Sequence, residues 1–467
     1  MVVINRMLFA LTIVFIPFIA SIGSPGMLGG MGTHLSFYPS FVMLFLFLVH
    51  CFVKRLKISV PNTPSFICLM LFSLWLLISG IVNIPNLLSV EFKGTVGISR
   101  FIVQAATFFI FISFSIVFAN CIMKLNNGIE FLERYLLYSF AIAGAYSLLE
   151  LLLIVDFGAM KDIISAVNIF RASAGEKLYF GRIRSVASEA SFFGMYAGII
   201  MPWLIMKWLT AHKHKLIWGI SCVYLLLLVV LSFSRTAYFI TAIEIYFIVF
   251  LFRREIKNNI RQIVVFLVVL LIVAFGILDQ LEDLFTFDVM EVITSFFTSN
   301  EENKHLTSDL TRIGSQYAAL KLFLDNPFCG VGFGAFGFYA SDYYPHEAWN
   351  SWEIQELGSN SINGAWPPVH GIYVRILAEL GFPGIVFWLG FLGYLVFGLY
   401  KKSKVVSDEI LKIKIRALLV SIIGCMMFGF NVDAFAVIGL WVFASFGWSI
   451  IQEKKCENRE QLGENNV

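Results

Sequence analysis

The chain has 467 residues, of which 58% are hydrophobic and 14% are charged, with a formal net charge of +3 at pH 7. Soluble domains contain about a quarter charged residues, so this composition excludes an ordinary soluble protein and indicates a membrane protein. The small net charge gives no indication of nucleic-acid binding. The seven cysteines are scattered without a CxxC pair, which supports neither a disulfide framework nor a metal site.

Apolar runs of about 20 residues, enough to cross a bilayer, recur along the chain. The first run is also compatible with a signal peptide, because Arg6 precedes an apolar core and small residues follow it. We interpret it as a span because apolar runs continue along the whole chain. The sequence thus predicts an all-α polytopic membrane protein with about twelve transmembrane helices. The expected spans are residues 7–22, 36–53, 64–84, 98–120, 133–155, 186–209, 216–233, 235–252, 262–280, 383–400, 415–431 and 433–451.

The distribution of lysine and arginine tests this topology, because cytoplasmic loops of membrane proteins are enriched in both. With the N-terminus inside, the inner segments contain 22 of the 34 basic residues, and every inner loop has at least one. A wrong number of spans would disturb this alternation after the error. The pattern therefore predicts a multi-pass protein with both termini in the cytoplasm.

Two connections on the outer side are long, and they divide the chain. Residues 1–280 are expected to contain nine transmembrane helices and a shorter outer loop at about residues 156–185. Residues 281–368 form a large outer loop, and residues 369–467 contain the last three spans and a cytoplasmic tail. Long loops on a rigid scaffold often carry function. No internal repeat is visible, which argues against a transporter built from inverted halves.

The large outer loop contains a helix signal that begins at the N-cap candidates Ser308 and Asp309 and ends before Pro327. We expect this helix to lie against the membrane surface or to pack over the bundle. Its apolar face follows helical spacing and consists of Leu310, Ile313, Tyr317, Leu320 and Leu324.

Twelve basic residues lie on the outer side, against the orientation rule, and seven of them are arginines. An arginine at the centre of a membrane helix costs about 2.5–3.5 kcal/mol on insertion scales, so we expect a compensating role. The planar guanidinium group is suited to binding phosphate. The candidate phosphate-binding residues are Arg182, Arg184, Arg235 and Arg312, with Arg171 as a further candidate.

Structural explanations also exist for the stronger candidates. Arg235 lies in a very short connection between two spans, where its side chain can extend toward lipid headgroups. Arg312 lies in the first turn of the expected outer helix, where its charge opposes the helix dipole unless an anion binds there. Arg184 and Glu189, at the entry to a span, are placed either to pair with each other or to act in a site.

Residues 366–388, WPPVHGIYVRILAELGFPGIVFW, place charged groups directly before an apolar run. Arg375 and Glu379 are four residues apart and would share one helix face, which favours a structural ion pair over a role in binding. Pro367, Pro368 and Gly371 place His370 at a helix start beneath the large loop. His370 is therefore a candidate catalytic base, with a hydrogen-bonded structural histidine as the alternative.

Three segments in order, SFSRTAY, TRIGSQYAALKLFLDNPFCGVGFGAF and HGIYVRILAELGFPG, resemble the bacterial O-antigen polymerase and O-antigen ligase superfamily, most closely over about residues 180–400. The resemblance implies a GT-C-like fold and glycosyl transfer from undecaprenyl diphosphate on the periplasmic side, without nucleotide sugar or metal. In the ligase branch, two arginines hold the diphosphate and a histidine activates the acceptor hydroxyl. The matching positions are Arg235, Arg312 and His370.

The resemblance favours a polymerase, which joins lipid-linked repeat units, over a ligase, which transfers the finished polysaccharide to lipid A-core. Ligases often have Asn at the position of Gly371, and the segment SVASEASFFGMY is closer to polymerases. Glu189 in that segment is an alternative base. A transporter of lipid-linked oligosaccharides is the alternative from another class of protein.

The resemblance also implies a location and a set of ligands. The chain is expected in the bacterial inner membrane, with undecaprenyl-diphosphate-linked oligosaccharides as substrates and without a cofactor or a nucleic-acid partner. A chain-length regulator and a flippase are compatible membrane partners. The first outer loop, SIGSPGMLGGMGTHLSFY, contains no Asp or Glu, unlike the acidic motif of metal-dependent relatives of the fold, and this predicts metal independence.

Overall fold

A computed structural model describes residues 2–19, 32–54, 58–125, 127–154, 182–211, 213–257, 304–362 and 364–463. This part of the chain is mostly helical, with one two-stranded antiparallel hairpin formed by β1 (Glu91–Phe92) and β2 (Thr95–Val96). Eleven of the twelve expected spans overlap a described helix. The remaining one, residues 262–280, lies outside the described residues, as do most of the shorter outer loop and Arg171.

The helices of the first half are α1 (Val2–Val14), α2 (Phe37–Lys54), α3 (Pro64–Val82), α4 (Ile84–Ser89), α5 (Gly97–Ile122) and α6 (Gly128–Ile154). They are followed by α8 (Ala190–Thr210), α9 (Lys215–Leu231), α10 (Arg235–Leu251) and α11 (Arg253–Lys257). The second half contains α14 (Lys304–Asp325), α15 (Phe336–Tyr343), the 3-10 helix η4 (His346–Asn350), α16 (Trp352–Gly358), α17 (Ile372–Val405), α18 (Glu409–Phe428) and α19 (Ile438–Gly463).

Six of the described helices, α2, α3, α5, α6, α8 and α17, are long and apolar enough to cross a membrane. Shorter apolar segments lie in α1, α9 and α19. Local signals fix several ends. Thr63 caps α3 by accepting a hydrogen bond from the Phe66 amide, and Asp408 caps α18 through the Ile410 amide. These findings support a multi-pass all-α membrane protein, while the number of twelve spans stays a prediction.

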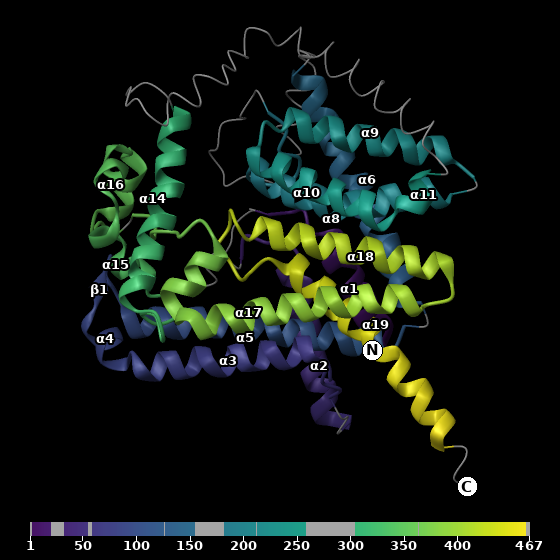
Figure 1. Ribbon diagram of the computed structural model, residues 1–467, viewed down its shortest axis with the longest axis horizontal. Coiled ribbons are helices and arrows are strands. Elements are labelled where there is room, and N and C mark those ends of the chain that lie inside the picture. The colour runs from purple at the N-terminus through teal and green to yellow at the C-terminus, as the bar shows by residue number, and fades with distance from the viewer. Residues whose placement is uncertain are drawn as a thin grey trace.

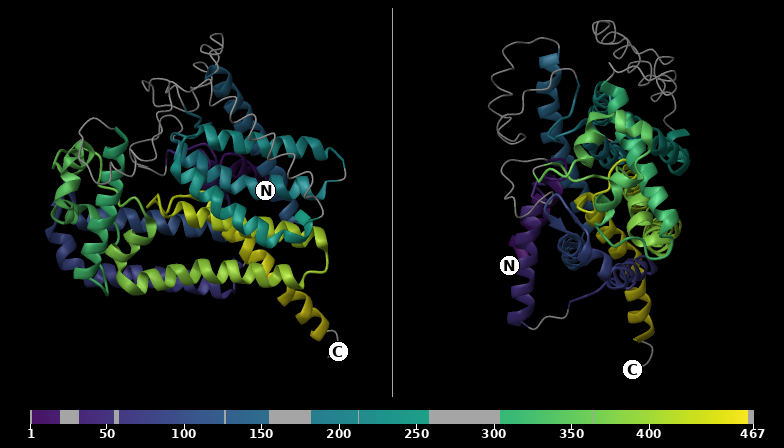
Figure 2. Two further views of the ribbon diagram at one scale, coloured as in Figure 1. Left: turned by 45° about the horizontal axis from the view of Figure 1, so that its top comes forward. Right: turned by 90° about the vertical axis from the view of Figure 1, so that its left-hand side faces the viewer.

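α3, α5, α17 and α18 run roughly side by side, and α14, α15 and α16 lie across one end of them (Figure 1). Figure 2 shows the same arrangement from a second direction, with α14 to α16 far from the C-terminus. α17 packs against α3 and α18, while α8 packs against α9, α10 and α18. Aromatic rings fill the space between α3, α5, α17 and α19, where Trp388 contacts Phe72, Phe435 and Trp441.

The helix expected in the outer loop is present as α14, but it packs through a different face. Its buried side consists of the small residues Thr311, Ser315, Ala318 and Ala319 together with Leu322. Small side chains allow α17 and η4 to approach closely. Four of the five residues of the expected apolar face, Ile313, Tyr317, Leu320 and Leu324, are exposed, and Leu324 is 72% accessible. The expected apolar face is therefore not the face through which α14 packs.

The loop after α14 is joined to a bend in α17 by backbone atoms. Gly381 interrupts α17 with φ 66° and ψ −167°, so the helix consists of two segments. The Phe382 amide donates to the Pro327 carbonyl at 2.8 Å, and the Gly332 amide donates to the Glu379 carbonyl at 3.0 Å. A Cβ atom at Gly381 would lie 2.1 Å from the Phe328 carbonyl oxygen. Only glycine fits this conformation and this close approach.

Candidate functional site

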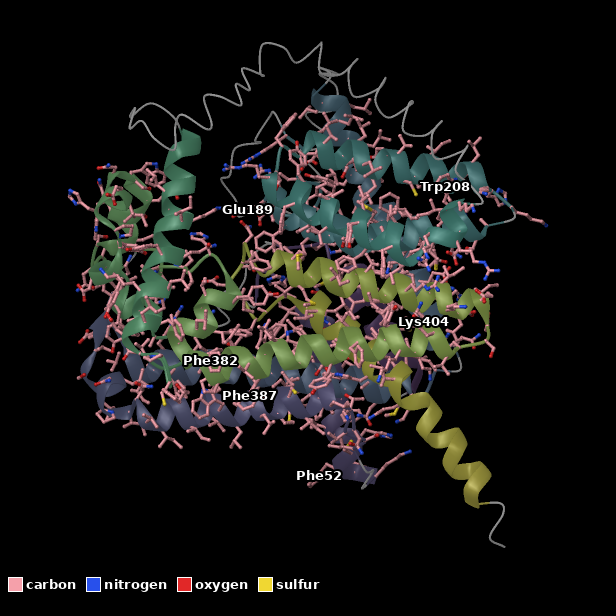
Figure 3. The ribbon with its side chains drawn as sticks, viewed as in Figure 1. Phe52, Glu189, Trp208, Phe382, Phe387 and Lys404 are labelled. Atoms are coloured by element: carbon pink, nitrogen blue, oxygen red, sulfur yellow. The ribbon has the colours of Figure 1, made fainter. Side chains whose placement is uncertain are left out.

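Segments far apart in the sequence meet at the end of the bundle where α14 lies (Figure 1). At this end α8 begins after Glu189, α10 begins at Arg235, α17 begins two residues after His370, and α18 ends at Phe428. Figure 3 shows Glu189 at the start of α8, on the side toward α14. The helix ends therefore bring most of the predicted site residues to one region.

His370 is held in an uncommon backbone conformation directly before α17. Its φ is +58°, in the left-handed region that residues other than glycine rarely adopt. The side-chain amide of Gln316 donates to the His370 carbonyl at 2.7 Å, and the Val369 amide donates to Oδ2 of Asp433 at 2.7 Å. The Nε2 atom of His370 is buried and has no hydrogen-bond partner in the described part of the chain. Strained residues of this kind cluster at functional sites.

The pKa of His370 depends on its burial and on the charged groups around it. Burial lowers this pKa from its ordinary value of 6.5 and is the largest effect. Asp433 raises it, Arg312 lowers it, and Glu353 and Glu189 raise it by smaller amounts. Because the balance is a lowered pKa, the imidazole is neutral at pH 7 and its nitrogen can accept a proton.

Arg312 reaches this region from α14. Its Nη1 donates to Oδ1 of Asn431, and Gln316, one turn later on the same face, also donates to the Phe430 carbonyl at 3.2 Å. Because α14 begins at Lys304, Arg312 lies in the third turn. The expected conflict with the helix dipole in the first turn is therefore wrong, since that effect is confined to the ends of a helix.

Two residues of the site, Asn431 and Asp433, lie in the connection between α18 and α19 and are not among those predicted from the sequence. Asn431 binds Arg312, and Asp433 binds the backbone beside His370. Their signal was a pair of polar side chains between two long apolar runs on the outer side. The expected spans 415–431 and 433–451 place both residues at span ends, where the sequence gives no indication of a contact with Arg312 or His370.

The predicted pair of Arg375 and Glu379 is present, with Nε and Oε2 3.0 Å apart. Glu379 is 2% accessible, and the remaining guanidinium nitrogens of Arg375 donate to the Asp433 carbonyl and to Oε1 of Gln104, at 2.8 and 2.9 Å. Arg375 thus connects α5, α17 and the loop that carries Asp433. The positive charge of Arg375 is paired with Glu379 inside the protein, which supports the interpretation as a structural ion pair.

Arg182 and Arg184 lie in the segment before α8. Oε2 of Glu150, from α6, accepts hydrogen bonds from the amides of Arg184 and Ser185, at 3.3 and 2.7 Å, which fixes this segment. The Arg184 guanidinium donates to the Ser188 carbonyl at 2.8 Å. Among the described residues, Glu189 is bound by the Ser191 hydroxyl at 3.1 Å and forms no ion pair with Arg184, so that alternative is wrong.

Arg235 is the first residue of α10, and its side chain is exposed. Ser234 caps the helix by accepting a hydrogen bond from the Ala237 amide at 3.3 Å. One turn into the helix, Phe239 contacts Phe430 with ring centroids 6.5 Å apart. The start of α10 therefore adjoins the loop that carries Asn431 and Asp433.

Two other basic residues of the outer side have structural partners. Lys93, 5% accessible, donates through Nζ to the Ala365 carbonyl at 2.7 Å and to the Glu356 carbonyl at 3.3 Å. The guanidinium carbon of Arg100 lies 4.3 Å from the centre of the Trp366 ring. These contacts explain two exceptions to the orientation rule without a ligand.

The site combines a neutral proton acceptor with guanidinium groups suited to an anion. His370 supplies the first and Arg312 from α14 supplies the second, while Arg235 begins α10 beside the loop that carries Asn431 and Asp433. Among the described residues, His, Cys, Asp and Glu form no group of three or more that could hold a metal ion, and metal independence stays a prediction.

Residues 220–389 match a protein-family model described as O-antigen ligase. The matched segment contains Arg235, Arg312 and His370 and ends before Asn431 and Asp433. The match supports the O-antigen ligase and polymerase superfamily and does not distinguish its two branches. No curated protein matches the chain.

Proposed function

We propose that this chain is a polymerase of O-antigen or a related surface polysaccharide, acting on the periplasmic face of the bacterial inner membrane. The observation that carries the proposal is the buried, unpartnered Nε2 of His370, placed among charged groups from α8, α14, α16 and the loop after α18. The substrates are repeat units linked to undecaprenyl diphosphate. The reaction needs neither a cofactor nor a metal ion.

In the proposed reaction, the acceptor hydroxyl of one lipid-linked repeat unit donates its proton to Nε2 of His370. The hydroxyl oxygen forms a bond to the anomeric carbon of the growing glycan while the bond from that carbon to the diphosphate breaks. The electron pair of the broken bond leaves with undecaprenyl diphosphate. The histidine, now protonated, is stabilised by the carboxylate of Asp433.

Arg312 and Arg235 are the proposed ligands of the diphosphate, with Arg182 and Arg184 as further candidates at the entry to α8. Each charge-assisted hydrogen bond contributes about 1.5–3 kcal/mol, and such bonds strengthen as the leaving diphosphate gains charge. The Asn431 contact orients Arg312 before substrate binds. Preorganised donors of this kind lower the barrier without further reorganisation.

Gly371 supports the polymerase over the ligase. A Cβ atom at this position would lie 3.1 Å from Cγ2 of Val374 and 3.3 Å from Nε2 of Gln316. A side chain such as Asn would therefore press on the amide that holds the His370 carbonyl.

The ligase is the second candidate, because the matching family model is described as O-antigen ligase. A transporter of the same lipid would keep its activity when one base is replaced.

The first test is a gel of surface lipopolysaccharide from the native host without this chain. A core with a single repeat unit and no ladder supports the polymerase. A bare core with accumulated lipid-linked polymer supports the ligase, and an unchanged ladder contradicts both for lipopolysaccharide. Complementation with His370→Gln should restore no ladder, whereas Glu189→Gln should restore it. The reverse result would assign the base to Glu189.

A further inference from the structure

A cavity lined by charged and apolar side chains lies at the opposite end of the bundle from His370. Its volume is about 290 Å³, and it lies between the end of α8 and the starts of α6, α9 and α18. Figure 3 shows Trp208 and Lys404 at this end, far from Glu189. The lining residues that matter here are Glu133, Lys207, Lys213, Trp218, Ile410 and Lys414.

The charges of this cavity do not cancel. Lys207 and Lys414 both pair with Glu133, and Lys414 also pairs with Glu130 at 3.3 Å. These two ammonium groups are therefore balanced by two carboxylates. Lys213 also lines the cavity, and no carboxylate in the described part of the chain lies within ion-pair distance of it. One positive charge is left, which matches a singly charged anion.

The cavity has an aromatic ring and exposed apolar side chains beside its charged groups. The Trp218 ring centroid lies 5.9 Å from Nζ of Lys207, and Trp is a residue enriched at membrane–water interfaces. Beside it on α9, Leu216 and Ile217 are 71% and 56% exposed, and Ile410 at the cavity edge is 59% exposed. An occupant with a charged head and apolar chains would satisfy both surfaces.

We propose that this cavity binds the phosphodiester headgroup of an anionic phospholipid such as phosphatidylglycerol, with the acyl chains along the exposed face of α9. The phosphate oxygens accept hydrogen bonds from Lys213 and from the donors that Lys207 and Lys414 retain beyond their ion pairs. Basic pockets between transmembrane helices bind anionic headgroups in this way. The inference does not depend on the proposed catalytic function.

The test uses the delipidated full chain in detergent with equimolar phosphatidylglycerol and phosphatidylethanolamine, and native mass spectrometry counts the bound lipids. The wild type should retain one phosphatidylglycerol in preference to phosphatidylethanolamine. Lys213→Gln should weaken phosphatidylglycerol binding about fivefold, the effect of one lysine near an anionic lipid. Lys213 is exposed, so the variant should fold normally.

Lys404→Gln is the matched control, because Lys404 is exposed at the same end of the bundle and lies outside the cavity. It should bind phosphatidylglycerol as the wild type does. Equal binding of the two lipids by the wild type, or an equal loss in both variants, overturns the proposal. Inorganic phosphate in excess should not displace the lipid. Phosphate binding that depends on Lys213, without preference for phosphatidylglycerol, also overturns it.

Discussion

Replacing Gln316 with Met should lower the catalytic activity, although Gln316 is a positioning residue and is not proposed to contact the substrate. The amide of Gln316 donates to the carbonyls of His370 and Phe430, at 2.7 and 3.2 Å. Met keeps the length of the side chain and removes both bonds. Each contributes about 0.5–1.5 kcal/mol, so the loss is about 1–3 kcal/mol. The left-handed backbone conformation of His370 costs about 1–3 kcal/mol, and the two hydrogen bonds help to offset this cost.

The expected result is a kcat lowered about 5- to 150-fold, because His370 is then less often in position for proton transfer. The assay follows polymer formation from lipid-linked repeat units by purified protein in membranes. Gln355→Met is the control, since Gln355 makes a comparable exposed bond to the Trp349 carbonyl at 2.8 Å. A wild-type kcat for Gln316→Met, or equal decreases in both variants, would refute the positioning argument.

The dependence of activity on pH should follow the lowered pKa of His370. Because the pKa of His370 lies below 6.5, activity should be constant near pH 7 and decrease only as the pH falls through that lowered value. Arg312 lowers and Asp433 raises the pKa of His370. In the residual activity of the variants, Arg312→Gln should therefore move the decrease to higher pH, and Asp433→Asn should move it to lower pH. Shifts of both variants in the same direction would contradict the assignment. Gly381→Ala should lower the Tm, since φ 66° with ψ −167° is a conformation nearly confined to glycine and costs about 1–3 kcal/mol for Ala before its clash with Phe328. Gly393→Ala, with nothing within 4 Å of the new Cβ, should leave the Tm unchanged or slightly higher.

Features that depend on local spacing could be predicted from the sequence. Apolar runs locate the helices because the bilayer requires long stretches without charge. The contact between Arg375 and Glu379 follows from their separation of four residues within one helix. His370 was identified because it adjoins prolines and a glycine at a helix start.

Features that depend on tertiary packing could not be predicted. Asp433 lies 63 positions after His370, and only the packing of α17 against α18 and α19 brings the two loops together. The buried face of α14 was also missed, because a hydrophobic pattern records large apolar residues. The packing of that helix uses Thr311, Ser315, Ala318 and Ala319, whose small size matters more than their polarity.

The two attachments of α14 to α17 have a mechanical consequence for substrate entry. Gln316 binds the start of α17 at His370, and the loop after α14 binds its bend at Gly381. A helix fixed at two points of its neighbour cannot swing away from it without breaking one of them. If the proposed substrate is a bulky lipid-linked glycan, this attachment predicts that it enters on the other side of His370, where α8 and α10 begin. The expected route is lateral from the bilayer, past helices that are not attached to α14 by these bonds.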